Sequence, residues 1–414
     1  MKILWVSHLV PNPPKAGVLI RSHYLVKELA KHHDVDLLAF NQKNLMEPYF
    51  DSYEQGTEKS RAVLSNYLGT IEIIDSPIDK STFTRYIIAL KSLLTKYPYN
   101  INWLVSTHFS AVLAAMLQSG DYDLVHFDTI GLAPYLKLID DKTLTSLDHH
   151  NVESHMLIRR SDGEKNLLKR WYFRQEGLRL EKVEQIECPR VSTNITCSDL
   201  DSERFENFIS GANFTTIPNG VDIDFFKPSQ FPSKNNQIIF IGTLDWYPNT
   251  VAAIALTTEI WPLLKDEHEQ LELHIIGSNP PKNIIACGNS DKRVFVHGFV
   301  DDIIQPLNDA TIYVCPISDG GGTKLKLLDA FAAGKAVVAH PVACEGLDIT
   351  DEENILLAST PKEFEVQISR LLLDAQLRQK LEHNARLHAV RHFSFSSIGK
   401  QLADHFSSLK KDPE

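Results

Sequence analysis

Cysteine is scarce in this sequence: there are five in 414 residues, an odd number, and none are in C-x-x-C spacing. This pattern argues against a disulfide framework and a cysteine-based zinc site, and it predicts a protein of a reducing compartment, the cytoplasm. Long uncharged hydrophobic runs are also missing. The longest stretch without Asp, Glu, Lys or Arg, residues 97–120, carries several polar side chains. We therefore expect a buried helix there and no membrane span.

Positive charge is not in excess either. Forty-two basic and 53 acidic residues give a formal net charge of −11, which argues against a dedicated nucleic-acid binder. No G-x-G-x-x-G sequence follows the strand predicted at 2–9 or the one at 237–244. A dinucleotide-dependent oxidoreductase is therefore disfavoured, although it would share the same class of fold.

The composition is that of an ordinary globular protein, 43% hydrophobic and 23% charged, and the length suits two domains. Short apolar runs alternate with helical patterns in two separate sets, which predicts two α/β domains with parallel sheets. Ligands of such sheets bind at the carboxyl ends of the strands, so we expect a site between the domains. The predicted strands are 2–9, 34–40, 123–127, 143–148, 192–198, 237–244, 271–277, 293–298, 311–317 and 336–341.

The most informative stretch is SDGGGTKLKLLDAFAAGKAVVAHPVACEGL, residues 318–347. Glycines 320–322 follow a buried strand and precede a predicted helix, 323–333, and such a loop exposes backbone N–H groups that bind phosphate. Lys326 and Asp329 share one face of that helix. A carboxylate there can accept two vicinal ribose hydroxyls. The alternative is a plain strand–turn–helix with a solvated Lys–Asp pair.

This stretch resembles the donor-binding motif of the retaining, nucleotide-sugar-dependent glycosyltransferases of family four, the group-one type. Other matching segments are LDHHNVESHMLIRR (147–160), IPNGVDIDFFKP (217–228) and IIFIGTLDWYPN (238–249). The resemblance implies the GT-B fold, two Rossmann-like doubly wound domains facing across a cleft. It implies an acceptor-binding domain at 1–222, a linker at 223–235, a donor-binding domain at 236–395, and a last helix, 396–414, returning to the first domain.

The resemblance also assigns roles to single residues. Asp329 corresponds to the glutamate that contacts the ribose, and His150 to the position facing the donor sugar, where an imidazole acts in catalysis with Lys326. The backbone at Phe299 and Val300 corresponds to the segment that reads the base. The diphosphate would meet Gly17, Gly321, Gly322, Thr323, Lys324 and Lys326. Gly321 departs from the family, which has a glutamate there.

Each assignment has a structural alternative. For His150 the alternative is a cap on the helix that follows it, for Phe299 and Val300 it is ordinary packing, and for Gly17 it is the end of a loop. Asp245 and Asn249 stand where the family usually has Arg and Lys. His8 and His149 are weaker candidates than His150.

The implied activity is transfer of a sugar from a nucleoside diphosphate to a glycan or lipid-linked saccharide, in exopolysaccharide or surface-glycan assembly. No cofactor and no bound metal are expected, because no Asp-x-Asp pair follows a strand at the donor site. The other function left open is a non-catalytic protein that binds nucleotide sugars or acts as a scaffold.

Residues 159–182 form a basic helical stretch that contains Trp171, Tyr172 and Phe173. Such a helix can lie on anionic lipid at the inner face of a membrane, as a peripheral contact. It can also be a solvated helix whose cations pair with Glu164, Glu176 and Glu181, which is the commoner case.

Overall fold

The computed structural model describes residues 1–14, 17–46, 49–77, 82–230, 233, 236–319 and 325–410. The chain forms two compact units. Unit 1 comprises Met1–Ile217 together with the C-terminal residues from Ile398, and unit 2 comprises Pro218–Ser397. The division falls five residues before position 222, where the sequence analysis ends the first domain.

Unit 1 is built on a seven-stranded sheet in the order β3-β2-β1-β4-β5-β6-β7, and every neighbouring pair is parallel. The aliphatic run of β1 has no exposed residue, as expected for a central strand covered on both faces. The strands are β1 (Lys2–Ser7), β2 (Asp34–Asn41), β3 (Ile71–Asp75), β4 (Leu124–Phe127), β5 (Leu144–His149), β6 (Thr193–Thr196) and β7 (Phe214–Thr216).

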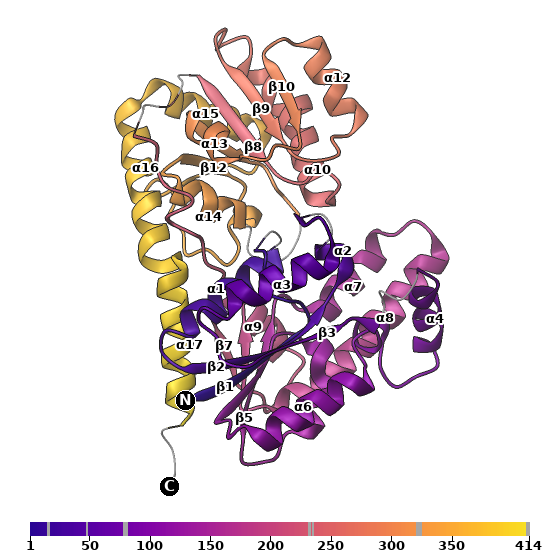
Figure 1. Cartoon of the computed structure of the whole chain (residues 1–414). Helices are drawn as coiled ribbons and strands as arrows, with labels where there is room; N and C mark the ends of the chain where they lie inside the picture. Colours follow the sequence, from indigo (N-terminus) through magenta and orange to yellow (C-terminus); the bar gives the residue numbers. More distant parts are fainter. Residues whose placement is uncertain are drawn as a thin grey trace. The chain divides into compact units, whose positions relative to one another are not determined.

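Helices surround this sheet (Figure 1). The last helix of the chain, α17 (Phe395–Leu409), adds Ile398, Leu402 and Phe406 to the core that contains Trp5 of β1. The others are α1 (Gly17–Leu29), α2 (Lys43–Met46), α3 (Tyr53–Leu64), α4 (Thr82–Ser92), α5 (Tyr99–Asn102), α6 (Thr107–Ser119), η3 (Ile130–Leu138), α7 (Glu153–Gly163), α8 (Leu167–Glu187), η4 (Cys188–Arg190) and α9 (Asp199–Glu206).

Unit 2 contains a six-stranded parallel sheet in the order β10-β9-β8-β11-β12-β13. Its core includes Phe240, Trp261 and Phe331. The strands are β8 (Gln237–Ile241), β9 (Glu272–Ile276), β10 (Val294–Gly298), β11 (Ile312–Cys315), β12 (Ala336–Ala339) and β13 (Leu356–Leu357). The helices are α10 (Tyr247–Ala255), η5 (Leu256–Ile260), α11 (Trp261–Leu264), α12 (Lys282–Ser290), α13 (Ile304–Asp309), α14 (Leu325–Ala332), η6 (Pro341–Cys344), α15 (Pro361–Leu373), α16 (Ala375–His388) and η7 (Ala389–Phe393).

All ten predicted strands are present, and the fold class, two Rossmann-like α/β domains, is confirmed. The sequence analysis missed β3, β7 and β13, which are short or half-exposed and so carry a weak hydrophobic signal. In each sheet the strand order reverses beside the first strand, between β1 and β4 in unit 1 and between β8 and β11 in unit 2. Such switch points are where ligands bind to open α/β sheets. Among the described helices, none is both long and apolar enough to cross a membrane.

Candidate functional site

The switch point of unit 2 carries Lys326 and Asp329, on the first turns of α14. The Lys326 ammonium donates a hydrogen bond to the Asn249 side-chain oxygen and lies 5.5 Å from the centre of the Phe240 ring, in β8. A methyl group built on Gly242, just after β8, would meet the Lys326 nitrogen at 2.9 Å. The missing side chain at position 242 therefore leaves the space into which Lys326 extends.

Asn249 is buried and holds Lys326 in place. Its side-chain nitrogen donates to the carbonyl of Thr243 at 2.9 Å, which leaves its oxygen for the lysine. The family to which the sequence is similar usually has a cation in this segment, and this chain has Asn249 instead. Lys326 reaches the same end of β8 from α14, so a positive charge is present there although it comes from another element.

The pKa values of Asp329 and Lys326 differ from those of a solvated surface pair. Burial raises the pKa of the Asp329 carboxyl to about 7, although Lys326 nearby opposes the rise. Burial likewise lowers the pKa of Lys326. A solvated i,i+3 pair is worth only about 0.2–0.5 kcal/mol and leaves both groups well hydrated. The charges of Lys326 and Asp329 are instead poorly hydrated, so a polar ligand would stabilise both.

Four residues assigned to the diphosphate, Gly321, Gly322, Thr323 and Lys324, lie outside the described residues.

The two residues assigned to the base differ in their exposure to solvent. Phe299 is 73% exposed, and Val300 packs against the core of unit 2. Simple packing therefore accounts for Val300 and not for Phe299. In unit 1, α1 begins at Gly17, directly after the loop that follows β1.

In unit 1, His8 follows β1 and Asp128 follows β4, and the two side chains are joined. His8 Nδ1 lies 2.8 Å from Asp128 Oδ1, and the His8 backbone N–H donates to the same oxygen at 3.0 Å. The Ser7 hydroxyl donates to the other oxygen of Asp128. A carboxylate fixed on the Nδ1 side of an imidazole leaves Nε2 as the nitrogen that can exchange protons.

Burial and ion pairing act in opposite directions on this pair. Burial disfavours the charged forms, but the His8 charge and hydrogen bond lower the pKa of Asp128 to about 2. Asp128 in turn raises the pKa of His8 above its ordinary value, against the effect of burial. The two groups therefore stay charged, as an imidazolium and a carboxylate, up to a higher pH than a free histidine would.

His150 lies beside this pair. Its ring centre is 6.0 Å from that of His8, and its Nε2 is buried without a hydrogen-bond partner among the described residues. Burial lowers the pKa of His150 despite the nearby carboxylates of Asp148 and Asp128. The helix-cap alternative does not fit, because the N-cap of α7 is Val152 and no side chain caps it. A neutral imidazole with an unused nitrogen is suited to a hydroxyl ligand.

Two further residues position this segment. Arg21, on α1, donates from Nε to Asp148 Oδ2 at 3.0 Å and from Nη2 to Asp148 Oδ1 at 3.2 Å, and both side chains are buried. His149, between Asp148 and His150, donates from Nε2 to Asn194 Oδ1 at 3.1 Å, and burial lowers its pKa to about 4. His149 is thus part of the core, which disfavours a direct role in catalysis.

Asp128, Arg21 and Glu153 were not picked out from the sequence. Glu153 is held near Thr129 and Asn100, at 3.3 Å from each side chain, and burial raises its pKa. Two of these three had a signal available: Asp128 directly follows a strand, and Glu153 is the acidic residue of the HNVE segment. For Arg21 the sequence carries no such signal, because a basic residue on an amphipathic helix is ordinarily solvated and is not expected to form a buried ion pair.

Metal-ligand atoms also gather here. Those of His8, Asp128 and His150 lie within 4.8 Å of one another, and so do those of Asp148, His150 and Cys197.

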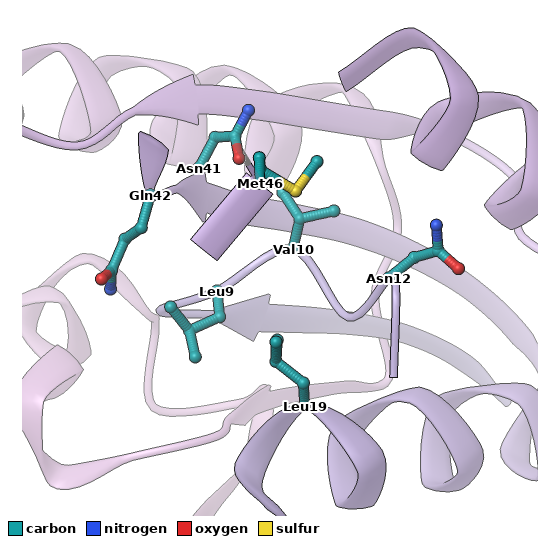
Figure 2. Close-up of a pocket in the computed structure, with 7 residues that line it drawn as sticks. All are labelled: Leu9, Val10, Asn12, Leu19, Asn41, Gln42 and Met46. Carbon is teal, nitrogen blue, oxygen red and sulfur yellow. The ribbon is translucent and has the colours of Figure 1, made fainter. Parts of the chain in front are cut away.

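Next to His8 there is a small pocket of about 10 Å³, bounded by apolar side chains and three amides (Figure 2). That is room for about one water molecule and none for a sugar. The lining residues are Leu9, Val10, Asn12, Leu19, Asn41, Gln42 and Met46.

The sequence matches two family models. The model described as Glycosyltransferase Family 4 matches residues 16–225, and the one described as Glycosyl transferases group 1 matches residues 235–374. A phosphatidyl-myo-inositol mannosyltransferase of Mycobacterium tuberculosis is 26% identical over 157 residues, 36% of this chain and 40% of that protein. A 44.6 kDa protein in the cps region of Klebsiella pneumoniae is 24% identical over 194 residues, 45% of this chain and 48% of that protein. The chain thus aligns with less than half the length of these relatives.

Solved structures resemble the whole chain. Sucrose-phosphate synthase from Thermosynechococcus elongatus has a TM-score of 0.68 at 16% identity, covering 99% of both chains. HepE of Anabaena, solved in complex with UDP, has a TM-score of 0.65 at 16% identity, covering 99% of this chain and 100% of that one. With the two parallel sheets, these similarities confirm the GT-B fold of two Rossmann-like domains.

Proposed function

Since the chain belongs to glycosyltransferase family 4, we propose that it moves a sugar from a nucleoside-diphosphate donor to a glycan or lipid-linked saccharide. The observation that carries the proposal is the half-buried pair of Lys326 and Asp329 at the switch point of unit 2. In this proposal Asp329 accepts the ribose hydroxyls, and Lys326 binds the diphosphate with Gly321, Gly322, Thr323 and Lys324. The backbone at Phe299 and Val300 contacts the base.

We propose that the reaction retains the anomeric configuration. The acceptor O–H bond breaks as its oxygen bonds to the anomeric carbon, the bond from that carbon to the phosphate oxygen breaks on the same face, and the leaving phosphate takes the proton. Negative charge grows on the diphosphate in this step, and lysine ammonium groups with the N-terminus of α14 stabilise it. No cofactor is required, and the lysines supply the charge that a metal would otherwise provide.

Unit 1 carries the groups proposed to act on the sugar and the acceptor. The free Nε2 of His150 is suited to a hydrogen bond with a sugar hydroxyl, and the N-terminus of α1 at Gly17 suits a phosphate oxygen. The five cysteines, all in the described residues, form no disulfide, and we place the protein in a reducing compartment, the cytoplasm. We place the activity in the assembly of surface polysaccharides, where nucleotide sugars are consumed.

We expect His150→Ala to lower kcat while changing the affinity for the nucleoside diphosphate little, because the proposal assigns the nucleotide to unit 2. The loss should be about 10- to 100-fold, the value of one or two hydrogen bonds made in the transition state. Steady-state kinetics together with calorimetric titration of UDP and GDP check it. His149→Asn serves as a neighbour control. An unchanged kcat in His150→Ala would remove this residue from the site.

Asp329→Asn should weaken binding of the nucleoside diphosphate by about 1.5–3 kcal/mol, which is roughly 10- to 150-fold. The carboxylate, not the acid, accepts both ribose hydroxyls. Because burial raises the pKa of Asp329 to about 7, wild-type affinity should increase as the pH rises from 6 to 8. Calorimetry of UDP across that range, with Asp329→Asn as the control for titration of the phosphate itself, measures the difference. Parallel pH profiles for the two proteins would contradict the ribose role.

A second candidate function is a non-catalytic protein that binds nucleotide sugars or acts as a scaffold. The observation in its favour is Gly321, where the family's first glutamate is replaced by a residue with no side chain. A nucleotide-sugar hydrolysis assay separates the two. Slow release of nucleoside diphosphate without an acceptor favours the enzyme, and tight binding with no release favours the binding protein.

A further inference from the structure

Exposed apolar side chains gather on two helices of unit 1. On α8 they lie in the first turns, and on α4 they follow one face and continue just past its end, at spacings of four residues. Leu168 is 79% exposed and Leu94 is 91% exposed, values that are unusual for leucine in a folded protein. The set comprises Tyr86, Leu90, Leu94, Leu167, Leu168 and Trp171, and we call it, with the basic residues around it, the α4–α8 surface.

The chain that follows α4 contacts α8, although the two helices start 85 positions apart in the sequence. Arg179, on α8, donates hydrogen bonds to the carbonyls of Thr95 and Tyr97, which directly follow α4. The backbone N–H of Tyr99 donates to the Glu176 carboxylate, also on α8. Figure 1 shows α4 beside α8, with α7 on the other side of α8. The apolar side chains of both helices therefore belong to one part of the protein surface.

This part of the surface is strongly basic in an acidic protein. Residues 82–96 and 159–174 contain nine Lys and Arg against two Asp and Glu, a net charge of +7, whereas the whole chain carries −11. The rest of the chain therefore carries −18. Such a concentration of one sign at one place attracts an anionic partner at distances up to about a Debye length.

Four of these nine cations have no acidic partner among the described residues. In the described part of the chain, Lys91, Lys165, Lys169 and Arg170 are exposed and form no ion pair. Glu176 pairs with Arg179 at 3.0 Å, as the solvated-helix alternative expects, but this pair lies further along α8, and Glu164 accepts the backbone N–H of Asn166. The solvated, internally paired helix that the sequence analysis left open does not describe the first turns of α8.

We propose that the α4–α8 surface docks on an anionic lipid bilayer, with its leucines and Trp171 entering the interface and its cations contacting the headgroups. The combination of exposed leucines, a tryptophan and unpaired lysines matches helices that lie in the membrane plane. Each lysine near an anionic leaflet adds to the attraction, and salt weakens it. A protein partner is a less good fit, because the cores of protein interfaces are depleted in lysine.

The proposal is tested with the full-length protein and vesicles. We expect it to co-sediment with vesicles of phosphatidylcholine and roughly 30% phosphatidylglycerol and to be released at about 1 M salt, where charges are screened within about 3 Å. Binding to pure phosphatidylcholine should be at least about tenfold weaker. The indole fluorescence of Trp171 should shift to shorter wavelength on binding, and Trp171→Phe should remove that shift.

Leu168→Ser and Leu373→Ser form a matched pair of variants. Both leucines are about equally exposed, 79% and 80%, and both lie on helices, α8 and α15. Leu168→Ser should lower the vesicle partition coefficient about tenfold, because a buried leucine is worth at least that, and Leu373→Ser should not. Lys169→Glu should likewise lower it more than the exposed control Lys282→Glu.

Two results would overturn the proposal: equal binding to neutral and anionic vesicles, or equal losses in Leu168→Ser and Leu373→Ser. Either would show that the α4–α8 surface does not contact lipid. Because the test measures vesicle binding and no enzyme activity, it is independent of the proposed glycosyl transfer.

Discussion

Replacing Lys326 by alanine is expected to lower kcat for sugar transfer about 10²–10³-fold, the usual effect of removing one group that stabilises charge in the transition state. Lys326 is held by Asn249 at the end of β8 and is poorly hydrated, so its charge is not weakened by water. Affinity for the nucleotide should fall much less, because charge on the diphosphate grows as the bond to the sugar breaks. Steady-state kinetics and calorimetric titration of the same variant separate the two effects.

Two controls sharpen this expectation. Lys326→Arg keeps the charge and should retain more activity than Lys326→Met, which keeps the length of the side chain without the charge. Lys324→Ala should have a smaller effect than Lys326→Ala, because only Lys326 shares a helical face with Asp329. A larger effect from Lys324 would mean that the diphosphate approaches the other face of α14. A fall in nucleotide affinity with unchanged kcat would contradict the transition-state role.

Replacing Asp148 by alanine is expected to lower the free energy of unfolding by about 3–5 kcal/mol. Both Asp148 and Arg21 are buried, and their two hydrogen bonds bring α1 against the end of β5. Removing the carboxylate takes away the buried negative charge that balances the Arg21 guanidinium, which costs far more than the pair itself contributes. Urea unfolding monitored by circular dichroism measures the change.

The exposed pair of Lys400 and Asp404 on α17, 2.6 Å apart, is the matched control. Asp404→Ala should change stability little, since solvated pairs contribute little. The double replacement Arg21→Met and Asp148→Leu should recover part of the loss. The Arg21 charge lowers the pKa of Asp148 against the effect of burial, so its stabilisation is present at neutral pH and is lost as the pH falls through the lowered pKa. A loss as small as that of the control would show that the buried pair is not needed for the fold.

The architecture was predictable because its strands are central and buried on both faces. The run ILWV of β1 and the run IIF of β8 can hardly be anything but strands of a parallel sheet, and their positions then give the two domains. The shortest strands, β7 and β13, were missed because three or two residues carry no period. The ends of strands were also overestimated: β8 ends at Ile241, three residues before its predicted end.

The candidate site was only partly predictable from the sequence. The spacing of Lys326 and Asp329 placed both on one face of a helix. That Lys326 reaches Asn249, 77 positions earlier, depends on the space left by Gly242, which no local pattern indicates. The pairing of His8 with Asp128 likewise depends on β1 and β4 being neighbours. A residue's burial and its partners far along the chain set its pKa, and both follow only from the fold.

The same limit applies to the surface of unit 1. The basic character of 159–182 was visible in the sequence, but the exposed leucines of α4 belong to another segment, and the Arg179 contacts join the two. Sequence spacing alone favoured a solvated helix. In the first turns, Lys165, Lys169 and Arg170 form no ion pair among the described residues, whereas the expected pairing is seen further along the helix, between Glu176 and Arg179.

The central claim is that this chain transfers a sugar from a nucleoside diphosphate, using Lys326 and Asp329. The most direct measurement is the release of nucleoside diphosphate from a panel of UDP- and GDP-sugars, with and without a lipid-linked saccharide fraction as acceptor. We predict that one donor is consumed, that the acceptor accelerates the release, and that Lys326→Ala abolishes most of it at saturating donor. Binding of nucleotide sugars with no release under any of these conditions, in a protein that binds UDP or GDP through Asp329, would contradict the claim and leave the non-catalytic function in its place.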